Sequence, residues 1–258
     1  MSETPTTPPK VIPAATVVIF RHGPDGGPPE LLMVQRAKEM RFAGGAAVFP
    51  GGRIDEADRV LAGRLAPAAD PDITAARIAG IRETLEETGL AVALGRPVTP
   101  TEAAEARTLL LETGELAAVL DRFGWQLDLE TLVPFARWCP MMDGAFDARF
   151  FLVDLGTGAV DVAVDATENT RLFWASAAEA LRLADAGDIH VIFPTRRNLD
   201  RLALFASFAE ARAHAEAIPV RMITPCPVER DGERWLTIPD GHGYPVTAQA
   251  MATVKRGL

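Results

Sequence analysis

The sequence has few of the features that mark a specialised class of protein. It contains two cysteines and one tyrosine in 258 residues, and aromatic side chains make up only 7%. Two cysteines cannot form a disulfide framework, and neither belongs to a C-x-x-C pair. The longest early apolar run, residues 11–20, is interrupted by Pro13 and is about half the length of a membrane span. We therefore expect neither a disulfide-stapled scaffold nor a membrane protein.

Positive charge is also scarce. The 26 Lys and Arg residues stand against 35 Asp and Glu residues, which gives a formal net charge of −9. This balance disfavours a general nucleic-acid binder, because a phosphate backbone rewards a basic surface. It still allows one small polyanionic ligand, provided that metal ions or a few arginines reverse the local field. The N-terminus lacks the basic and apolar regions of a signal peptide, so we expect a cytoplasmic protein.

Apolar periodicity and turn residues predict alternating strands and helices. We expect strands over 14–20, 31–35, 91–93, 132–138, 149–154 and 171–174, and further apolar segments at 220–223 and 235–238. We expect helices from Asp72 or Thr74 to Thr88, within 100–122 on either side of Gly114, over 177–186 and over 196–216. Residues 1–11 have the composition of a disordered tail, and residues 12–258 are interpreted as a single α/β domain with insertions.

The helix that should end near Thr88 carries three carboxylates on one face. At about 100° per residue, with Glu83 at zero, Glu86 falls near 300° and Glu87 near 40°. The apolar positions of the segment lie opposite: Ile78, Ile81 and Leu85. Gly80 flanks the acidic face and would leave room there for a loop or a ligand.

Two interpretations of this acidic face are open. On a solvated helix, like-charge pairs cost only about 0.2–0.5 kcal/mol each, so the face could be plain surface. In a cleft, two carboxylates about 6 Å apart would repel by about 3 kcal/mol at an effective dielectric near 20. Such a cluster would require a hard divalent cation with oxygen ligands, such as Mg²⁺ or Mn²⁺.

Two motifs together favour the second interpretation. F-P-G-G at 49–52 is followed about thirty residues later by R-E-T-L-E-E-T-G-L at 82–90. The pair resembles the Nudix hydrolases, whose box reads G-x5-E-x7-R-E-U-x-E-E-x-G-U, with U a bulky apolar residue. Thr84 departs from an apolar position, and the distance from Gly52 to Arg82 is about sixteen residues too long. An insertion near 57–74 is therefore expected, and Asp58 and Glu56 are both candidates for the upstream box acid.

The resemblance implies an α/β/α sandwich around a mixed β-sheet, with helical insertions near 57–74 and 100–125. It implies hydrolysis of a nucleoside diphosphate linked to another group. Glu83, Glu86 and Glu87 would hold Mg²⁺ or Mn²⁺, and a carboxylate would take a proton from the attacking water. Glu83 is the leading candidate for this base and Glu168 is the second, while Arg82 would orient the acidic cluster.

Residues 32–52 resemble the signature of coenzyme A diphosphatases, L-L-T-x-R-[SA]-x3-R-x3-G-x3-F-P-G-G. The matching positions are Arg36, Ala37, Arg41, Gly45 and residues 49–52. Met33 and Val34 depart from its start. Guanidinium groups bind phosphate bidentately, so Arg36 and Arg41 could contact a polyphosphate substrate, or they could simply pair with acidic residues.

The glycines of this region would let the backbone approach the substrate: Gly45, Gly51 and Gly52. Later segments extend the resemblance to the longer coenzyme A diphosphatase-like branch, and Trp138, Phe150 and Phe151 could line a substrate pocket or belong to the core. Coenzyme A or an acyl derivative is thus the favoured substrate. The alternatives are another substrate (a nucleotide sugar, NADH or a dinucleoside polyphosphate) or a catalytically silent binding domain. Each of these interpretations is compatible with a homodimer.

Overall fold

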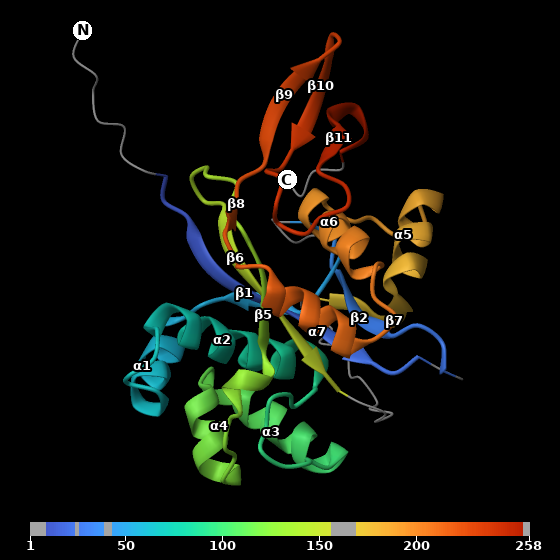
Figure 1. The fold of residues 1–258 in the computed structure, drawn as a ribbon. Coiled ribbons are helices and arrows are strands. Elements are labelled where there is room, and N and C mark those ends of the chain that lie inside the picture. Colours follow the sequence, from blue (N-terminus) through green and yellow to red (C-terminus); the bar gives the residue numbers. More distant parts are fainter. Residues whose placement is uncertain (1–8, 24–25, 39–42, 156–168, 255–258) are drawn as a thin grey trace, which may run out of the picture.

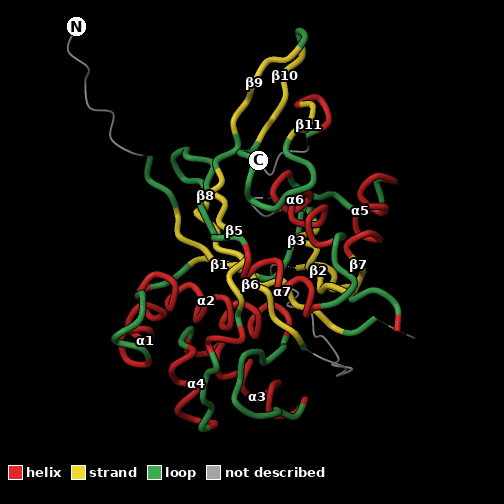
Figure 2. The backbone as a smooth tube through the Cα atoms, in the orientation of Figure 1, coloured by secondary structure: helices red, strands yellow, loops and turns green. Residues whose placement is uncertain are grey.

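One large mixed sheet lies between two layers of helices, and residues 226–250 form a small three-stranded sheet beside it (Figures 1 and 2). The computed structural model describes residues 9–23, 26–38, 43–155 and 169–254. The large sheet has eight strands in the order β3-β2-β1-β6-β5-β8, with β4 paired to β1 and β7 to β2. This architecture confirms the expected α/β/α sandwich.

The strands of the large sheet are β1 (Ile12–Arg21), β2 (Glu30–Arg36), β3 (Ala47–Val48), β4 (Gly51–Arg53), β5 (Val133–Trp138), β6 (Phe146–Asp154), β7 (Asn169–Ser176) and β8 (Met222–Ile223). The small sheet consists of β9 (Cys226–Arg230), β10 (Glu233–Thr237) and β11 (Ala248–Ala250). The helices are α1 (Glu56–Leu65), α2 (Pro71–Thr88), α3 (Pro100–Thr113), α4 (Leu116–Phe123), α5 (Ala177–Ala186), α6 (Phe193–Leu202) and α7 (Phe208–Ala217). Two short 3₁₀ turns cover Leu129–Thr131 and Met251–Thr253.

Strand β1 separates two hydrophobic cores. Val17 and Ile19 belong to the core that includes buried residues of α1 to α4. Val18 and Phe20 belong to the core on the other side, which includes buried residues of α5 to α7. Successive side chains of a strand point to opposite faces, so an uninterrupted apolar strand must be covered on both sides. The consecutive apolar residues 17–20 of β1 therefore require a covering layer on each face of the sheet.

Helix α2 packs on the face of the sheet that carries Val17 and Ile19, and it begins slightly earlier than expected. Asp70 caps it, accepting hydrogen bonds from the backbone nitrogens of Asp72 and Ile73. The predicted start at Asp72 or Thr74 is wrong, because Pro71 suits the first helical position and Asp70 is then the residue that caps the helix. Gly89 ends the helix in the left-handed region at φ +74°, as predicted.

Gly80 faces the sheet and not a ligand site. A β-carbon at this position would lie 2.8 Å from Cγ2 of Val17, so β1 and not a loop or a ligand occupies the space beside Gly80. The glycine allows α2 to approach the sheet closely.

Two local predictions are wrong. Residues 91–93 form no strand, because Ala93 adopts φ +56° and only Leu94 makes an isolated bridge, with Leu127. The helix predicted over 196–216 is two helices, α6 and α7, and Ser207 caps the second by accepting a hydrogen bond from Glu210 N. Gly114 separates α3 from α4 as predicted.

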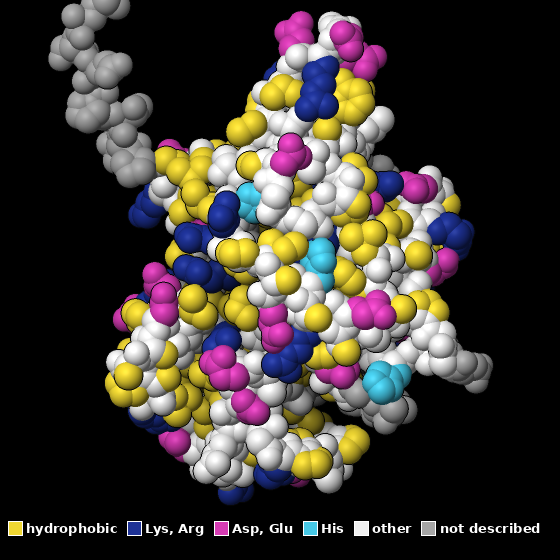
Figure 3. Space-filling view, in the orientation of Figure 1, with side chains coloured by type: hydrophobic (Ala, Val, Ile, Leu, Met, Phe, Trp, Pro, Cys, Tyr) yellow, Lys and Arg dark blue, Asp and Glu magenta, His cyan; other side chains and the backbone are white. Residues whose placement is uncertain are grey.

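The aromatic residues Trp138, Phe150 and Phe151 are buried among the two cores, so the core interpretation of these side chains is the right one. Of the helices in the described ranges, none has the length and apolarity needed to cross a bilayer. Acidic and basic side chains are interspersed across the face shown in Figure 3.

Candidate active site

The F-P-G-G segment brings backbone against the acidic face of α2. Gly51 has φ +154°, and a side chain there would collide with the carbonyl of Ala15 in β1. A side chain at Gly52 would collide with the carboxylate of Glu83. The two glycines therefore let β4 lie close to both the central strand and the carboxylates: a side chain at Gly51 would meet backbone, and one at Gly52 would have to displace the Glu83 carboxylate.

Glu87 is 4% exposed and is held at both carboxylate oxygens. Gly51 N donates to Oε2 at 2.9 Å, and Asn169 Nδ2 approaches Oε1 at 3.5 Å. Burial raises the pKa of Glu87 to about 8, even though the bond from Gly51 opposes the shift. The charge of Glu83 acts in the same direction as burial.

Glu83 and Glu86 complete the acidic face. The Glu83 side chain is 15% exposed and accepts a hydrogen bond from Arg82 Nη1 at 2.8 Å. Burial raises the pKa of Glu83 to about 7; Arg82 opposes this and the charge of Glu86 adds to it. Glu86 lies nearer solvent, at 35% exposure, and 3.8 Å from the same guanidinium nitrogen. The face is thus partly desolvated rather than ordinary helix surface.

Arg82 ties the acidic face to helix α1. Its Nε and Nη2 each donate to one oxygen of Asp58 at 3.0 Å, and Nη2 also donates to the carbonyl of Arg53. Burial would lower the pKa of Arg82, but its bond to Asp58 and the charges of Glu83 and Asp58 raise it. Asp58 is 2% exposed, whereas Glu56 is exposed. Of the two candidates for the upstream acid, the structure therefore brings Asp58 to Arg82.

The remaining predicted residues lie at the end of β2 and beyond. Arg36 is half-buried at the last position of β2, and its charge lowers the pKa of Glu87 against the effect of burial. Among the described residues its Nε has no hydrogen-bond partner. Gly45 turns the chain at φ +73°, and its nitrogen donates to the carbonyl of Ala37. Arg41 and Glu168 lie outside the described residues.

Two residues that no sequence pattern marked contact the acidic helix. Asn169 Nδ2 contacts Glu87, and Arg107 of α3 donates from Nε to the carbonyl of Glu86 at 2.8 Å. Neither belongs to a motif. The only signal for Asn169 was its position next to Glu168.

The oxygen donors of this face suit a hard divalent cation. Over the described ranges, no three His, Cys, Asp or Glu side chains are already arranged around a metal position. Glu83 and Glu87 are nevertheless desolvated carboxylates on one helix face, and a divalent cation is the kind of partner that such groups favour. The donor set therefore fits Mg²⁺ or Mn²⁺.

The fold of the chain resembles that of a solved structure. The crystal structure of a NUDIX hydrolase from Alicyclobacillus acidocaldarius matches with a TM-score of 0.67 and 30% sequence identity, over 80% of this chain and 96% of that one. The chain belongs to the Nudix hydrolase family. The acyl-coenzyme A diphosphatase NUDT19 of Gallus gallus is 26% identical over 265 residues, which cover 81% of this chain and 68% of that protein. No family model matches the chain.

In this Nudix hydrolase the departure from the box at Thr84 is accommodated in the interior. Thr84 is fully buried on α2, and its carbonyl accepts a hydrogen bond from Thr88 Oγ1. Its own Oγ1 is buried and has no hydrogen-bond partner among the described residues, so the departure places a polar atom in an apolar position without interrupting the helix.

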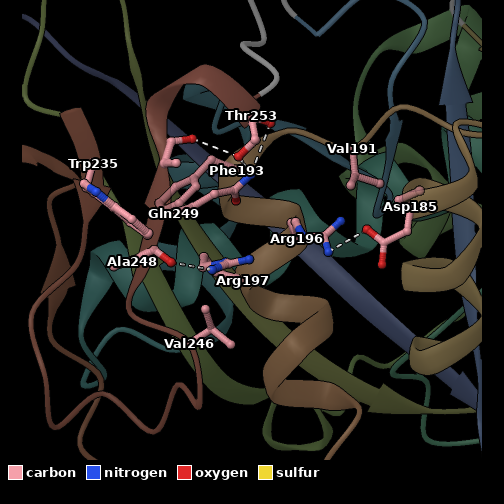
Figure 4. A pocket seen from close by; sticks show the side chains of 12 residues that line it. Asp185, Val191, Phe193, Arg196, Arg197, Trp235, Val246, Ala248, Gln249 and Thr253 are labelled. Carbon is pink, nitrogen blue, oxygen red and sulfur yellow. Dashed lines mark hydrogen bonds and ion pairs between the residues drawn. The ribbon is translucent and has the colours of Figure 1, made fainter. Parts of the chain in front are cut away.

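A separate cavity of about 480 Å³ lies between α5, α6 and the C-terminal strands (Figure 4). None of the described site residues lines it. Its arginines are paired within the fold, Arg196 with Asp185 at 2.7 Å and Arg197 with Asp200 at 2.8 Å. We assign it no part in the hydrolase site.

Proposed function

We propose that this Nudix hydrolase cleaves the diphosphate of a nucleoside diphosphate-linked substrate, and that the substrate is coenzyme A or an acyl-coenzyme A. The observation that carries the proposal is the pair of desolvated carboxylates, Glu83 (15% exposed) and the buried Glu87, packed against Gly51 and Gly52. The likeness to an acyl-coenzyme A diphosphatase and the signature over residues 32–52 support the choice of substrate.

Mg²⁺ or Mn²⁺ would be held by Glu83, Glu86 and Glu87. When bound, the cation would neutralise the diphosphate and make water a better nucleophile. Glu83 is our first candidate for the base and Glu168 the second. Arg82 keeps Glu83 in place through the bond to Nη1.

The substrate phosphates would meet Arg36 and Arg41, because guanidinium groups bind phosphate oxygens in pairs. Gly45, Gly51 and Gly52 would let the backbone approach the ligand. We further propose that residues 12–258 form one domain, with insertions near 57–74 and 100–125, acting in the cytoplasm.

A substrate panel tests the activity. The protein is incubated with coenzyme A, acyl-coenzyme A, a nucleotide sugar, NADH and a dinucleoside polyphosphate, with Mg²⁺ or Mn²⁺, and products are identified by mass. We expect 3′-phosphoadenosine phosphate and phosphopantetheine fragments from coenzyme A. If no diphosphate is turned over, the chain is a binding domain and the proposal fails.

Two substitutions test the cation ligands. Glu86→Gln and Glu87→Gln should each lower kcat by orders of magnitude, because an amide replaces an anionic oxygen, while circular dichroism shows an intact fold. Activity equal to that of the parent in either variant would remove that residue from the ligand set.

A further inference from the structure

Asn169 occupies a place in the site that no motif marks. It is the first residue of β7 and is 1% exposed. Across the sheet it is in register with Arg36, where the β2–β7 pairing shifts by a residue. Such irregularities redirect side chains and are common beside active sites. The shift brings Asn169 and Arg36 to the same end of the sheet as Glu87.

Of the two polar atoms of the Asn169 amide, the nitrogen has a hydrogen-bond partner and the oxygen has none among the described residues. Its Nδ2 is the donor to Oε1 of Glu87, while Gly51 N supplies the donor to Oε2. Its Oδ1 is buried and has no hydrogen-bond partner in the part of the chain that the structure describes. A buried acceptor without a partner costs about 1–3 kcal/mol, so a polar partner at Oδ1 would be favoured.

We propose that Asn169 is a positioning residue of the hydrolase site, whose amide nitrogen fixes the carboxylate of Glu87 for a divalent cation. This inference rests on the proposed function. Asn169 and Gly51 hold one carboxylate oxygen each and so set the rotation of the group. An amide provides this donor without adding a negative charge beside three glutamates, which an aspartate would do.

The test is a double-mutant cycle read by Mn²⁺ affinity in the absence of substrate, measured by electron paramagnetic resonance. The proteins are the parent, Asn169→Leu, Glu87→Gln and the double variant. Leucine has nearly the shape of asparagine but cannot donate, so the buried position remains filled; Asn169→Ala is the second variant if Leu perturbs folding. Thr170→Ala is the matched control, because Thr170 is the next residue, is exposed, and donates from Oγ1 to the carbonyl of Gln35 rather than to the acidic helix.

We expect Asn169→Leu to weaken Mn²⁺ binding about tenfold, the lower end for residues that orient a ligand. In the Glu87→Gln background the same change should have no further effect, because Asn169 acts through Glu87. Thr170→Ala should bind like the parent.

The outcomes separate the two proposals. If Glu87→Gln binds Mn²⁺ as tightly as the parent, the proposed ligand set is wrong. If Glu87→Gln weakens binding but both Asn169 variants bind like the parent, the role of Asn169 is overturned while the ligand set stands. If Asn169→Leu weakens binding equally in both backgrounds, Asn169 does not act through Glu87 and the inference is again overturned.

Discussion

Gly51 and Gly52 are adjacent, but they are required by different neighbours. Gly51 is fitted to the backbone of β1, so a side chain there would disturb the central sheet. Gly52 is fitted to the carboxylate of Glu83, so a side chain there would disturb the site. Substitution of the second glycine therefore tests function with less damage to the fold.

Gly52→Ala should lower kcat about a hundredfold, because the new methyl group displaces Glu83 and a misplacement of about 1 Å can have that effect. Steady-state kinetics with Mg²⁺ measures the loss. Gly63→Ala is the control. Gly63 lies in α1, where the new β-carbon would meet open space, and alanine should stabilise the helix by about 0.5–1 kcal/mol. A kcat of Gly52→Ala equal to that of the parent would contradict the close approach of Gly52 to the Glu83 carboxylate.

Arg36→Ala should raise KM for coenzyme A more than KM for dephospho-coenzyme A, by roughly tenfold, if its guanidinium binds the 3′-phosphate. We expect the same direction for Arg41→Ala. Arg64→Ala, which removes an exposed arginine of α1, should leave both KM values unchanged. Equal changes for the two substrates would show that Arg36 does not contact the 3′-phosphate.

At the scale of elements, α2 is supported from the side by α3. Arg107 donates to the carbonyl of Glu86 in the last turn of α2, where backbone carbonyls lack partners within the helix. The predicted insertion near 100–125 thus contributes a residue that holds the backbone of a proposed cation ligand.

Arg107→Ala should lower the free energy of unfolding by about 1.5–3 kcal/mol, the range for a hydrogen bond from a charged donor. It should also reduce kcat severalfold, because the end of α2 is less firmly held. Urea unfolding and steady-state kinetics measure the two effects. Thr108→Ala changes the next, exposed residue of α3 and should have neither effect; if Arg107→Ala behaves in the same way, α3 does not support the site.

The sequence predicted elements whose signals are local. The acidic and apolar faces of α2 follow from helical periodicity, and Gly89 and Gly114 mark helix ends through their left-handed backbone. The break between α6 and α7 was missed because one serine, Ser207, gives a weak signal inside an otherwise helical segment.

Tertiary contacts were harder to predict. Periodicity could not show whether the acidic face is solvated or enclosed, because that depends on β4 packing against Glu83. Only the structure shows that Asp58 and not Glu56 contacts Arg82, since both are close to the expected distance from Gly52. Asn169 could not be found, because its role depends on the register of β7 against β2.

At the scale of the whole molecule, the buried carboxylates link stability to pH. The pKa values of Glu83 and Glu87, about 7 and 8, lie above the ordinary value of 4.5. A group whose pKa is raised on folding contributes its full stability below the unfolded pKa, and this is lost as pH rises through the folded pKa. The metal-free protein should therefore become less stable between pH 5 and pH 9.

Thermal unfolding in EDTA should show Tm falling across this range, and Mg²⁺ should reduce the fall by stabilising the charged carboxylates. The Glu83→Gln/Glu87→Gln variant should have a flatter profile and little response to Mg²⁺. A parental Tm that is constant from pH 5 to pH 9 in EDTA would show that the carboxylates are not strained by burial.

The pairing of β1 with β6 also has a consequence for synthesis on the ribosome. Nine parallel pairs join the two strands, from Ile12 with Phe146 to Phe20 with Asp154, so the centre of the sheet is made from distant parts of the chain. Contacts of such long sequence separation form late in folding. A nascent chain that ends before residue 146 has β1 with one edge unpaired, and it must be kept from aggregating until β6 emerges.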